Sequence, residues 1–225
     1  MTVLDPKSDA QRAFDAIHAG GIAIMPMDVG YSLIGGRPAA LARIFDTKRR
    51  APSKLNAMLG NDAIARDLFM LSARGWKVYE AITQDYDLPL GAVAPYRVSH
   101  PMFNNLDAGT ISRSTKDGTL LMLVNAGRFH AEITRISHAR QFALFGSSAN
   151  LSLSGTKFDG ADIEPEIKAI ADVFIDYGLM KYHPWRASST ILNLETLEVV
   201  RVGSCYENLA SLLKRHFGVT LQERR

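Results

Sequence analysis

The chain has 225 residues, of which 47% are hydrophobic and 22% charged, with a formal net charge of +3 and a pI near 9.0. These values are typical of a globular protein with a large core, and the mild positive charge suits an anionic partner but falls short of a dedicated nucleic-acid binder. A single cysteine, Cys205, excludes an internal disulfide. The longest apolar stretches, 21–25 and 142–145, are far shorter than the roughly 20 residues that span a bilayer, and residues 1–10 lack the apolar region of a secretory signal. We therefore expect a cytoplasmic protein.

The predicted elements alternate between helices and strands. Residues 8–19 have apolar side chains at helical spacing behind Ser8 or Asp9 as a cap, and Gly20 and Gly21 end this helix. In chain order, the pattern then predicts a strand over 22–25, a helix over 39–45, a strand over 55–59, helices over 63–69 and 73–82, an irregular stretch over 85–107, a strand over 120–124, a helix over 129–138, a strand over 142–145, a helix from Asp162 to 171, strands over 173–177, 190–194 and 197–202, and a helix over 208–217.

Two of these predictions concern how neighbouring elements pair. The strand, helix and strand over 120–145 are typical of a βαβ unit, and the strands over 190–194 and 197–202 are typical of a hairpin. Because no repeat, linker or low-complexity tract interrupts the order, we predict a single α/β domain over residues 8–217.

Polar clusters follow or end several predicted strands, which is where ligands bind in open α/β sheets. The clusters are Asp28 with Tyr31, Lys48 with Arg50, the run from Ser147 through Ser148 to Asn150, and Arg186 with Ser189 and Arg201.

Two of the clusters have side chains suited to phosphate. The small residues 146–148 let backbone N–H groups approach phosphate oxygens, while Lys48 adds a point charge and Arg50 a planar fork. Together they predict a nucleotide site. A plainer interpretation stays open for each cluster: residues 48–50 as a solvated loop, 147–150 as an ordinary turn, Arg201 as a surface strand residue, and Asp28 as a turn cap.

Other chemistries lack support in the sequence. The six histidines are scattered without metal-ligand spacing, so we expect no protein-bound metal site. The chain also has no Gly-x-Ser-x-Gly elbow, Walker loop or Gly-x-Gly-x-x-Gly run.

Taken in order, the polar clusters resemble the YrdC-like family, the threonylcarbamoyl-adenylate synthases and their YciO relatives. Five landmarks match across roughly residues 10–205: 26–33 (PMDVGYSL), 48–50 (KRR), 148–150 (SAN), 189–193 (STILN) and 201–203 (RVG). Their occurrence in the family's order is far more specific than any single motif.

The resemblance implies a twisted open α/β sheet with flanking helices around a basic cavity. It also implies a reaction in which an amino acid, bicarbonate and ATP with Mg²⁺ give a carbamoyl-adenylate and pyrophosphate for tRNA modification. By resemblance, Lys48 and Arg50 hold phosphates and carboxylate, and Asp28 and Tyr31 shape the amino-acid end. The nucleotide is held by Ser147, Ser148, Asn150, Ser189 and Arg201.

Several positions depart from the family pattern. Met27 and Val29 replace both threonines of the opening motif, and the arginine of the family's Arg-x-Pro strand end is missing near residues 124–126. The spacing after Asn150 is longer, with three residues, 151–153, before Ser154.

These departures leave alternatives to the synthase open. One is a catalytically reduced, YciO-like paralogue that binds RNA or nucleotide, and another is a carbamoyl-handling enzyme of a small-molecule pathway. Proteins of tRNA modification are possible partners, and we expect no membrane association.

Overall fold

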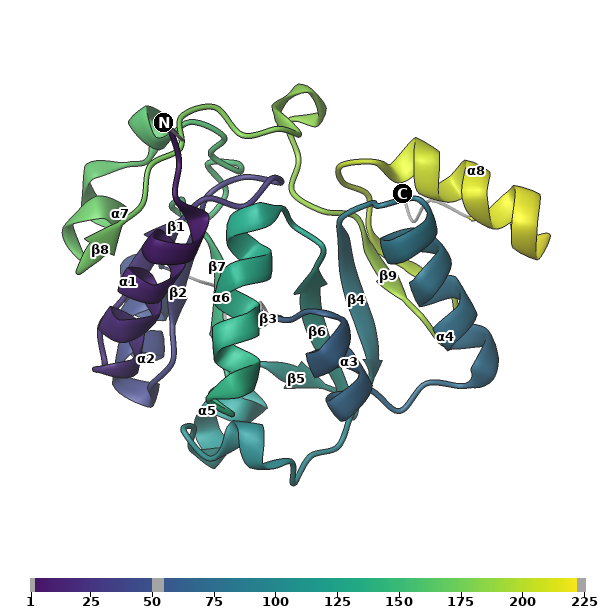
Figure 1. Ribbon diagram of the computed structural model, residues 1–225, viewed down its shortest axis with the longest axis horizontal. Helices are drawn as coiled ribbons and strands as arrows, with labels where there is room; N and C mark the ends of the chain where they lie inside the picture. Colours follow the sequence, from purple (N-terminus) through teal and green to yellow (C-terminus); the bar gives the residue numbers. More distant parts are fainter. Residues whose placement is uncertain (1–2, 50–54, 222–225) are drawn as a thin grey trace.

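The computed structural model describes residues 3–49 and 55–221, whose strands form one mixed sheet flanked by helices (Figure 1). The strand order is β10-β9-β4-β6-β3-β7-β2-β1-β8, and β5 pairs with the start of β6. The strands are β1 (Ala23–Met25), β2 (Ser32–Gly35), β3 (Ala57–Leu59), β4 (Leu90–Pro95), β5 (Thr115–Lys116), β6 (Thr119–Val124), β7 (Phe145–Ser148), β8 (Val173–Phe174), β9 (Ile191–Asn193) and β10 (Val199–Arg201). The chain therefore has the predicted single-domain α/β fold.

Helices connect most of the strands. They are α1 (Pro6–His18), α2 (Pro38–Thr47), α3 (Asp62–Leu68), α4 (Ala73–Glu80), α5 (Ala108–Ser112), α6 (Arg128–Ala139), α7 (Pro165–Ala169) and α8 (Tyr206–Phe217), with a π-helical turn over Ala81–Asp85 and 3₁₀ turns over Pro101–Phe103, Gly160–Asp162 and His183–Trp185. Within the described ranges, no helix combines the length and apolar character needed to cross a bilayer.

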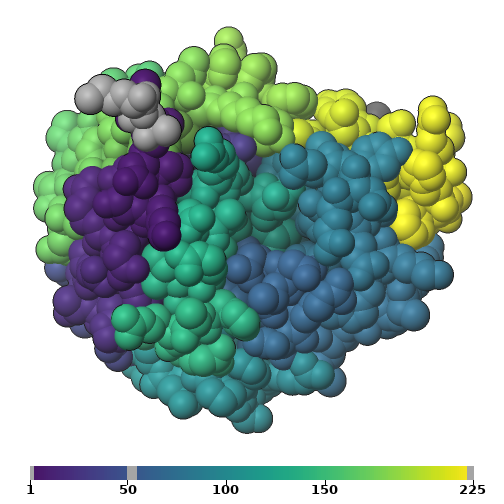
Figure 2. Space-filling view, viewed as in Figure 1, coloured from purple at the N-terminus to yellow at the C-terminus, as the bar shows by residue number. Residues whose placement is uncertain are grey.

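The core lies on both faces of the sheet, because successive strand residues point to opposite sides. Met58 belongs to one buried cluster and its neighbour Leu59 to the other, and Leu33 and Ile34 divide in the same way. The second cluster is covered by α1 and α6, which lie side by side in Figures 1 and 2. Both views also show the segment around 176–190 crossing the top of the molecule toward α8.

The predicted βαβ unit is wrong. β6 and β7 are joined by α6, but β3 lies between them, parallel to β6 and antiparallel to β7. Apolar runs report that a strand is buried and carry no information on the direction of its partner. The predicted hairpin is confirmed, since β9 and β10 pair antiparallel.

The irregular stretch predicted over 85–107 contains the long central strand β4, which pairs with both β6 and β9. Pro89 and Gly91 concealed it, because both residues are depleted from strands. The glycine is needed here: a Cβ at Gly91 would lie 2.8 Å from the Ile191 side chain on β9.

Other boundaries move for local reasons. The strand predicted over 142–145 is β7 at Phe145–Ser148, so Ser147 and Ser148 lie in the sheet and not beyond it. Gly146 belongs in β7 because a Cβ there would collide with the Leu33 carbonyl oxygen. Asp5, not Ser8 or Asp9, caps α1, because Pro6 fits the first helical position.

The helix predicted from Asp162 is a 3₁₀ turn followed by the short α7, which begins at Pro165. Proline lacks an N–H and restricts the residue before it, so the helix starts afresh at that point.

Candidate functional site

Lys48 lies at the C-terminus of α2 and is buried, with 3% of its surface exposed. The helix places it there by packing Ala40, Leu41 and Ile44 into the core. Its ammonium donates to the carbonyl oxygens of Ser148, at 2.5 Å, and Asn150. A buried charge needs such partners, so residue 48 does not belong to a solvated loop.

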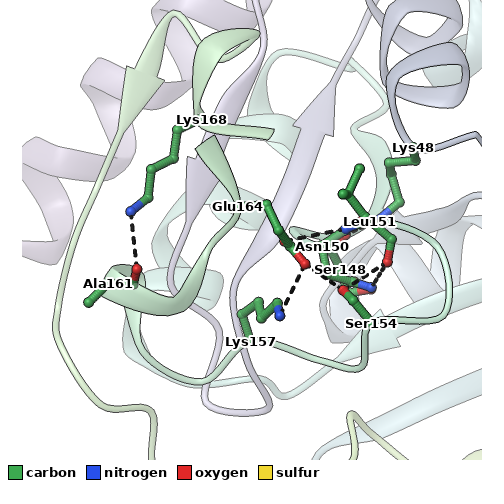
Figure 3. A network of polar contacts seen from close by, with 9 residues as sticks. All are labelled: Lys48, Ser148, Asn150, Leu151, Ser154, Lys157, Ala161, Glu164 and Lys168. Carbon is green, nitrogen blue, oxygen red and sulfur yellow. Dashed lines mark hydrogen bonds and ion pairs between the residues drawn. The ribbon is translucent and has the colours of Figure 1, made fainter. Parts of the chain in front are cut away.

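The chain bends after Ser148, the last residue of β7, so that the Asn150 N–H donates to the Ser148 carbonyl at 3.0 Å (Figure 3). The Ser148 hydroxyl donates to Oδ1 of Asn150, and Asn150 Nδ2 donates to the carbonyl of Leu151 at 2.5 Å. Ser152 donates from its backbone N–H, at 3.3 Å, and its hydroxyl, at 2.6 Å, to the Lys48 carbonyl. We call Lys48 and residues 148–152 the α2–β7 corner.

Ser147 lies one residue before the corner, in β7. Its hydroxyl oxygen is buried and has no hydrogen-bond partner among the residues that the structure describes. Two further side-chain oxygens within the same ranges share that condition, Asn56 Oδ1 and Thr110 Oγ1.

Tyr31 is fully buried and joins the corner to the segment that follows β8. Its carbonyl accepts from the Ala149 N–H at 2.8 Å, and its hydroxyl lies 2.6 Å from Asp176 Oδ1 and accepts from the Tyr177 N–H at 3.0 Å. Burial and the hydrogen bond to Asp176 raise the pKa of Tyr31. The tyrosine therefore supports the site from within the core.

Asp28 lies in a separate cavity of about 620 Å³, the Asp28 groove. The groove runs between the start of α6 and the 177–182 segment, and its polar lining includes Asp28, Asp87, Asn125, Arg128, Lys181 and Tyr182. Lys181 Nζ lies 3.8 Å from Asp28 Oδ2. Burial raises the pKa of Asp28, and the charge of Lys181 opposes that rise in part.

Gly127 allows the Asp28 carboxylate to lie against the start of α6. It has φ +102°, and a Cβ on it would collide with Asp28 Oδ1. A side chain at this position is therefore disfavoured both by backbone conformation and by space, because the Asp28 carboxylate would have to shift.

Ser189 and Arg201 meet at the β10 end of the sheet, with β4, β6 and β3 between β9 and β7. Arg201 Nη2 donates to the Ser189 carbonyl at 2.7 Å, and Ser189 is 3% exposed. Arg50 lies outside the described residues. The structure thus brings Lys48, Ser148 and Asn150 into direct contact and places Asp28 and the Ser189–Arg201 pair in two other regions.

Sequence reasoning missed three residues beside the corner and the groove: Lys157, Glu164 and Lys181. None lies in a motif, and the contacts of each are made with residues distant in sequence or across a loop. The longer spacing after Asn150 was the one visible signal, because it implies a loop of altered path.

The fold and the site together define an α/β protein in which the end of α2 contacts a Ser-Ala-Asn turn after β7. The family model described as telomere recombination (Sua5, YciO and YrdC) matches residues 15–203. The chain belongs to the Sua5/YciO/YrdC family. No curated protein matches the chain in sequence.

Solved structures with the same fold include three informative neighbours. A hypothetical protein, smu.1377c from Streptococcus mutans UA159, has a TM-score of 0.78 at 18% identity over 94% of this chain and 93% of its own. P. abyssi Sua5 complexed with L-threonine has a TM-score of 0.76 at 15% identity, over 98% of this chain and 61% of its own. E. coli YciO has a TM-score of 0.66 at 18% identity, over 90% and 93%. The chain therefore spans about three fifths of the Sua5 structure and nearly the whole of the other two.

Proposed function

We propose that this protein is an ATP-using enzyme of the threonylcarbamoyl-adenylate synthase type. The observation that carries the proposal is the α2–β7 corner, where the lysine of one family motif holds the Ser-Ala-Asn segment of another. Family membership over residues 15–203 and the fold shared with a Sua5 bound to L-threonine support it.

The proposed reaction joins three substrates. The amine of an amino acid adds to the carbon of bicarbonate and, with loss of water, gives a carbamate. A carbamate oxygen then attacks the α-phosphorus of ATP, the bond to the bridging oxygen breaks, and pyrophosphate leaves with that electron pair. Such chemistry depends on orientation and on neutralising phosphate charge more than on acid–base groups. Mg²⁺ would enter with the nucleotide, because it is held largely by substrate phosphates and water.

The corner suits the nucleotide end of this reaction. Lys48 contributes a buried positive charge, and Ser148 and Asn150 contribute hydroxyl and amide groups whose orientation is fixed by hydrogen bonds. On the family resemblance we assign Ser147, Ser189 and Arg201 to the same nucleotide, Arg50 to its phosphates, and Asp28 to the amino-acid end. The Ser189–Arg201 pair and Asp28 lie in regions other than the corner, so a substrate would have to reach across the sheet to meet them. Tyr31, which is fully buried, would shape the amino-acid end only from within the core.

Residues 27 and 29 are Met and Val, where the family pattern has threonines. Met27 and Val29 are each 1% exposed and pack in the core beside α1 and α6. Neither offers a hydroxyl to a substrate, and a site that lacks a partner for a substrate hydroxyl loses selectivity for it. We therefore propose a less polar amino acid or a simple amine as the acceptor of bicarbonate.

A second candidate function is a YciO-like protein that binds nucleotide or RNA without turnover. It is favoured by the match to E. coli YciO over nearly the whole of both chains and by the absence of the strand-end arginine. Binding of RNA would weaken steeply with salt and would not depend on bicarbonate.

The decisive experiment is pyrophosphate release from ATP with bicarbonate and Mg²⁺, screened against the twenty amino acids and simple amines. Turnover that requires bicarbonate and one amine supports the synthase. ATP binding without turnover under any of these conditions supports the second candidate, and absence of ATP binding contradicts both nucleotide proposals.

The site assignment is tested with Lys48→Met, which removes the charge and keeps much of the aliphatic stem. We expect ATP affinity to fall about tenfold or more, the loss of about one charge-assisted interaction. Arg49→Met is the matched control, because that neighbour is 80% exposed and contacts Glu166 at 3.9 Å. If Lys48→Met does not fold, Ser148→Ala keeps the lysine and tests the same corner. Unchanged ATP affinity in a folded variant would contradict the assignment.

A further inference from the structure

Hydrogen bonds and an ion pair hold the segment between Asn150 and α7 in place (Figure 3). It contains the longer spacing seen in the sequence, residues 151–153, and at its tip Leu153 is 90% exposed with φ +73°. A loop with such an exposed tip would move freely unless polar contacts held its two sides.

Glu164, the residue that precedes α7, supplies most of those contacts. Its Oε1 accepts from the Ser154 hydroxyl at 2.6 Å and from Lys157 Nζ at 3.1 Å. Its Oε2 accepts from the Leu151 N–H at 3.4 Å. One carboxylate therefore joins three points of the loop that follows the Ser-Ala-Asn segment.

These contacts are partly shielded from solvent. The side chains of Lys157 and Glu164 are only 18% and 20% exposed, so their ion pair is screened less than an ordinary surface pair. Burial alone would raise the pKa of Glu164, but the hydrogen bonds from Ser154 and Lys157 outweigh it and lower that pKa. The carboxylate is charged at neutral pH.

The far side of the loop is fixed against the turn before β2. The Tyr31 N–H donates to the Lys157 carbonyl at 2.8 Å. A Cβ on Gly30 would collide with the Thr156 side chain, which shows how closely the two segments approach. The loop is thus held between α7, the Gly30–Tyr31 turn and, through Ser152, the end of α2.

We propose that Glu164 is a positioning residue for the candidate nucleotide site. By joining Leu151, Ser154 and Lys157 it holds the start of the loop in place, and with it the orientation of Ser148 and Asn150. The inference rests on the proposed function, because those residues are taken to bind the nucleotide. Its consequence is that ATP affinity depends on a side chain that does not itself touch ATP.

The test compares Glu164→Ala and Glu164→Gln with Glu166→Gln as the matched control. Glu166 lies two residues further on, in the first turn of α7, is 58% exposed, and contacts only the exposed Arg49 among the ion pairs of the described residues. ATP affinity is measured by titration well below the melting temperature of each variant, and hydrogen exchange is followed at the amides of residues 149–152.

We expect ATP affinity to fall about tenfold in Glu164→Ala, corresponding to about one lost hydrogen-bonded contact to a charged group. Glu164→Gln should recover part of that loss, because its amide oxygen still accepts from Ser154. Exchange at Leu151 should quicken in the same order, and Glu166→Gln should match the wild type in both measurements.

The outcomes separate the inference from the function beneath it. Wild-type ATP affinity in Glu164→Ala, with faster exchange at Leu151, would show a purely structural role and overturn the inference alone. Unchanged exchange at Leu151 in Glu164→Ala would show that Glu164 does not hold the loop in place. Failure of the wild-type protein to bind ATP would overturn the proposed function, and the positioning role with it.

Discussion

The α2–β7 corner and the Asp28 groove differ in how many hydrogen-bond partners surround their partly or fully buried charged groups. In the corner, the Lys48 ammonium has carbonyl partners, and beside it the Glu164 carboxylate has donors at 2.6 and 3.1 Å. In the groove, Asp28 pairs with Lys181 at 3.8 Å. Behind the groove lining, on the first turn of α6, the buried His130 faces backbone groups.

The pKa shifts follow this difference. Hydrogen bonds prevail at Glu164 and lower its pKa, whereas burial raises the pKa of Asp28 and lowers that of His130 to about 4. A buried group therefore keeps its charge only where enough donors or acceptors converge on it. Glu164 beside the corner thus keeps its charge, whereas Asp28 and His130, with fewer partners, are shifted toward their neutral forms. Lys181 in the groove remains charged, because burial is outweighed by its contacts with Tyr182 and Asp28, which raise its pKa.

The largest expected effect concerns His130, the buried residue between the groove-lining Phe129 and Ala131. Its folded-state pKa of about 4 lies below the ordinary 6.5, so as pH falls the unfolded chain takes up the proton first. The stability that His130 contributes by staying neutral should be fully present above pH 6.5. It should be lost progressively down to about pH 4, by roughly 3 kcal/mol in total. Urea unfolding of wild type and His130→Gln across this range checks it. An equal pH slope in both proteins would show that other groups cause the acid sensitivity.

Gly127→Ala tests how closely the Asp28 carboxylate packs against the start of α6. The new Cβ would collide with Asp28 Oδ1 and would have to adopt a φ of +102°. We expect a loss of about 2 kcal/mol in the free energy of unfolding, measured by urea denaturation. Gly118→Ala is a useful control, since its φ is +72° but no atom of the described residues lies within 4 Å of the place its methyl group would take. If both variants lose the same stability, the Asp28 contact contributes nothing.

Tyr31→Phe tests the connection between the two regions. The change leaves the backbone bonds to Ala149 and Lys157 intact but removes the hydroxyl that accepts from the Tyr177 N–H. The part-buried Tyr177 N–H loses its acceptor, and Asp176 Oδ1 and the Gly178 carbonyl lose a donor, so stability should fall by about 1 kcal/mol or more. Hydrogen exchange should quicken at Tyr177 and Gly178 while residues 149–152 remain protected. Faster exchange in both segments would mean that the two regions open together.

Asp28→Asn is the smallest expected effect. Because the folded-state pKa of Asp28 is raised, the aspartate opposes folding once pH exceeds its ordinary value of 3.8, and this cost reaches its full size above the raised pKa. The asparagine variant should be slightly more stable than wild type at pH 7, by under about 1 kcal/mol given the opposing Lys181 contact. The difference should vanish below pH 3.8. A less stable variant at pH 7 would mean that the Lys181 pair outweighs burial.

Sequence patterns located most elements because amphipathic spacing reports directly on burial. The helices ending near His18 and Phe217 and the β9–β10 hairpin lie where apolar periodicity predicted them. β4 was missed because Pro89 and Gly91 break the local pattern, and Gly91 is required only by the close approach of β9. Sheet order depends on contacts between distant segments, so local sequence could not reveal β3 between β6 and β7.

The ordered motifs were sufficient to identify the family, because landmarks in the right order specify a fold even when individual residues change. Sequence alone also indicated that Lys48 and residues 148–150 belong together. Only the tertiary structure decided how: the lysine is buried with its ammonium on two backbone carbonyls, Tyr31 supports the site from the core, and Glu164 holds the loop behind it. The physical reason is that the charge state and orientation of a polar group depend on its neighbours in space, and those neighbours come from segments more than 100 residues apart for Lys48 and Asn150.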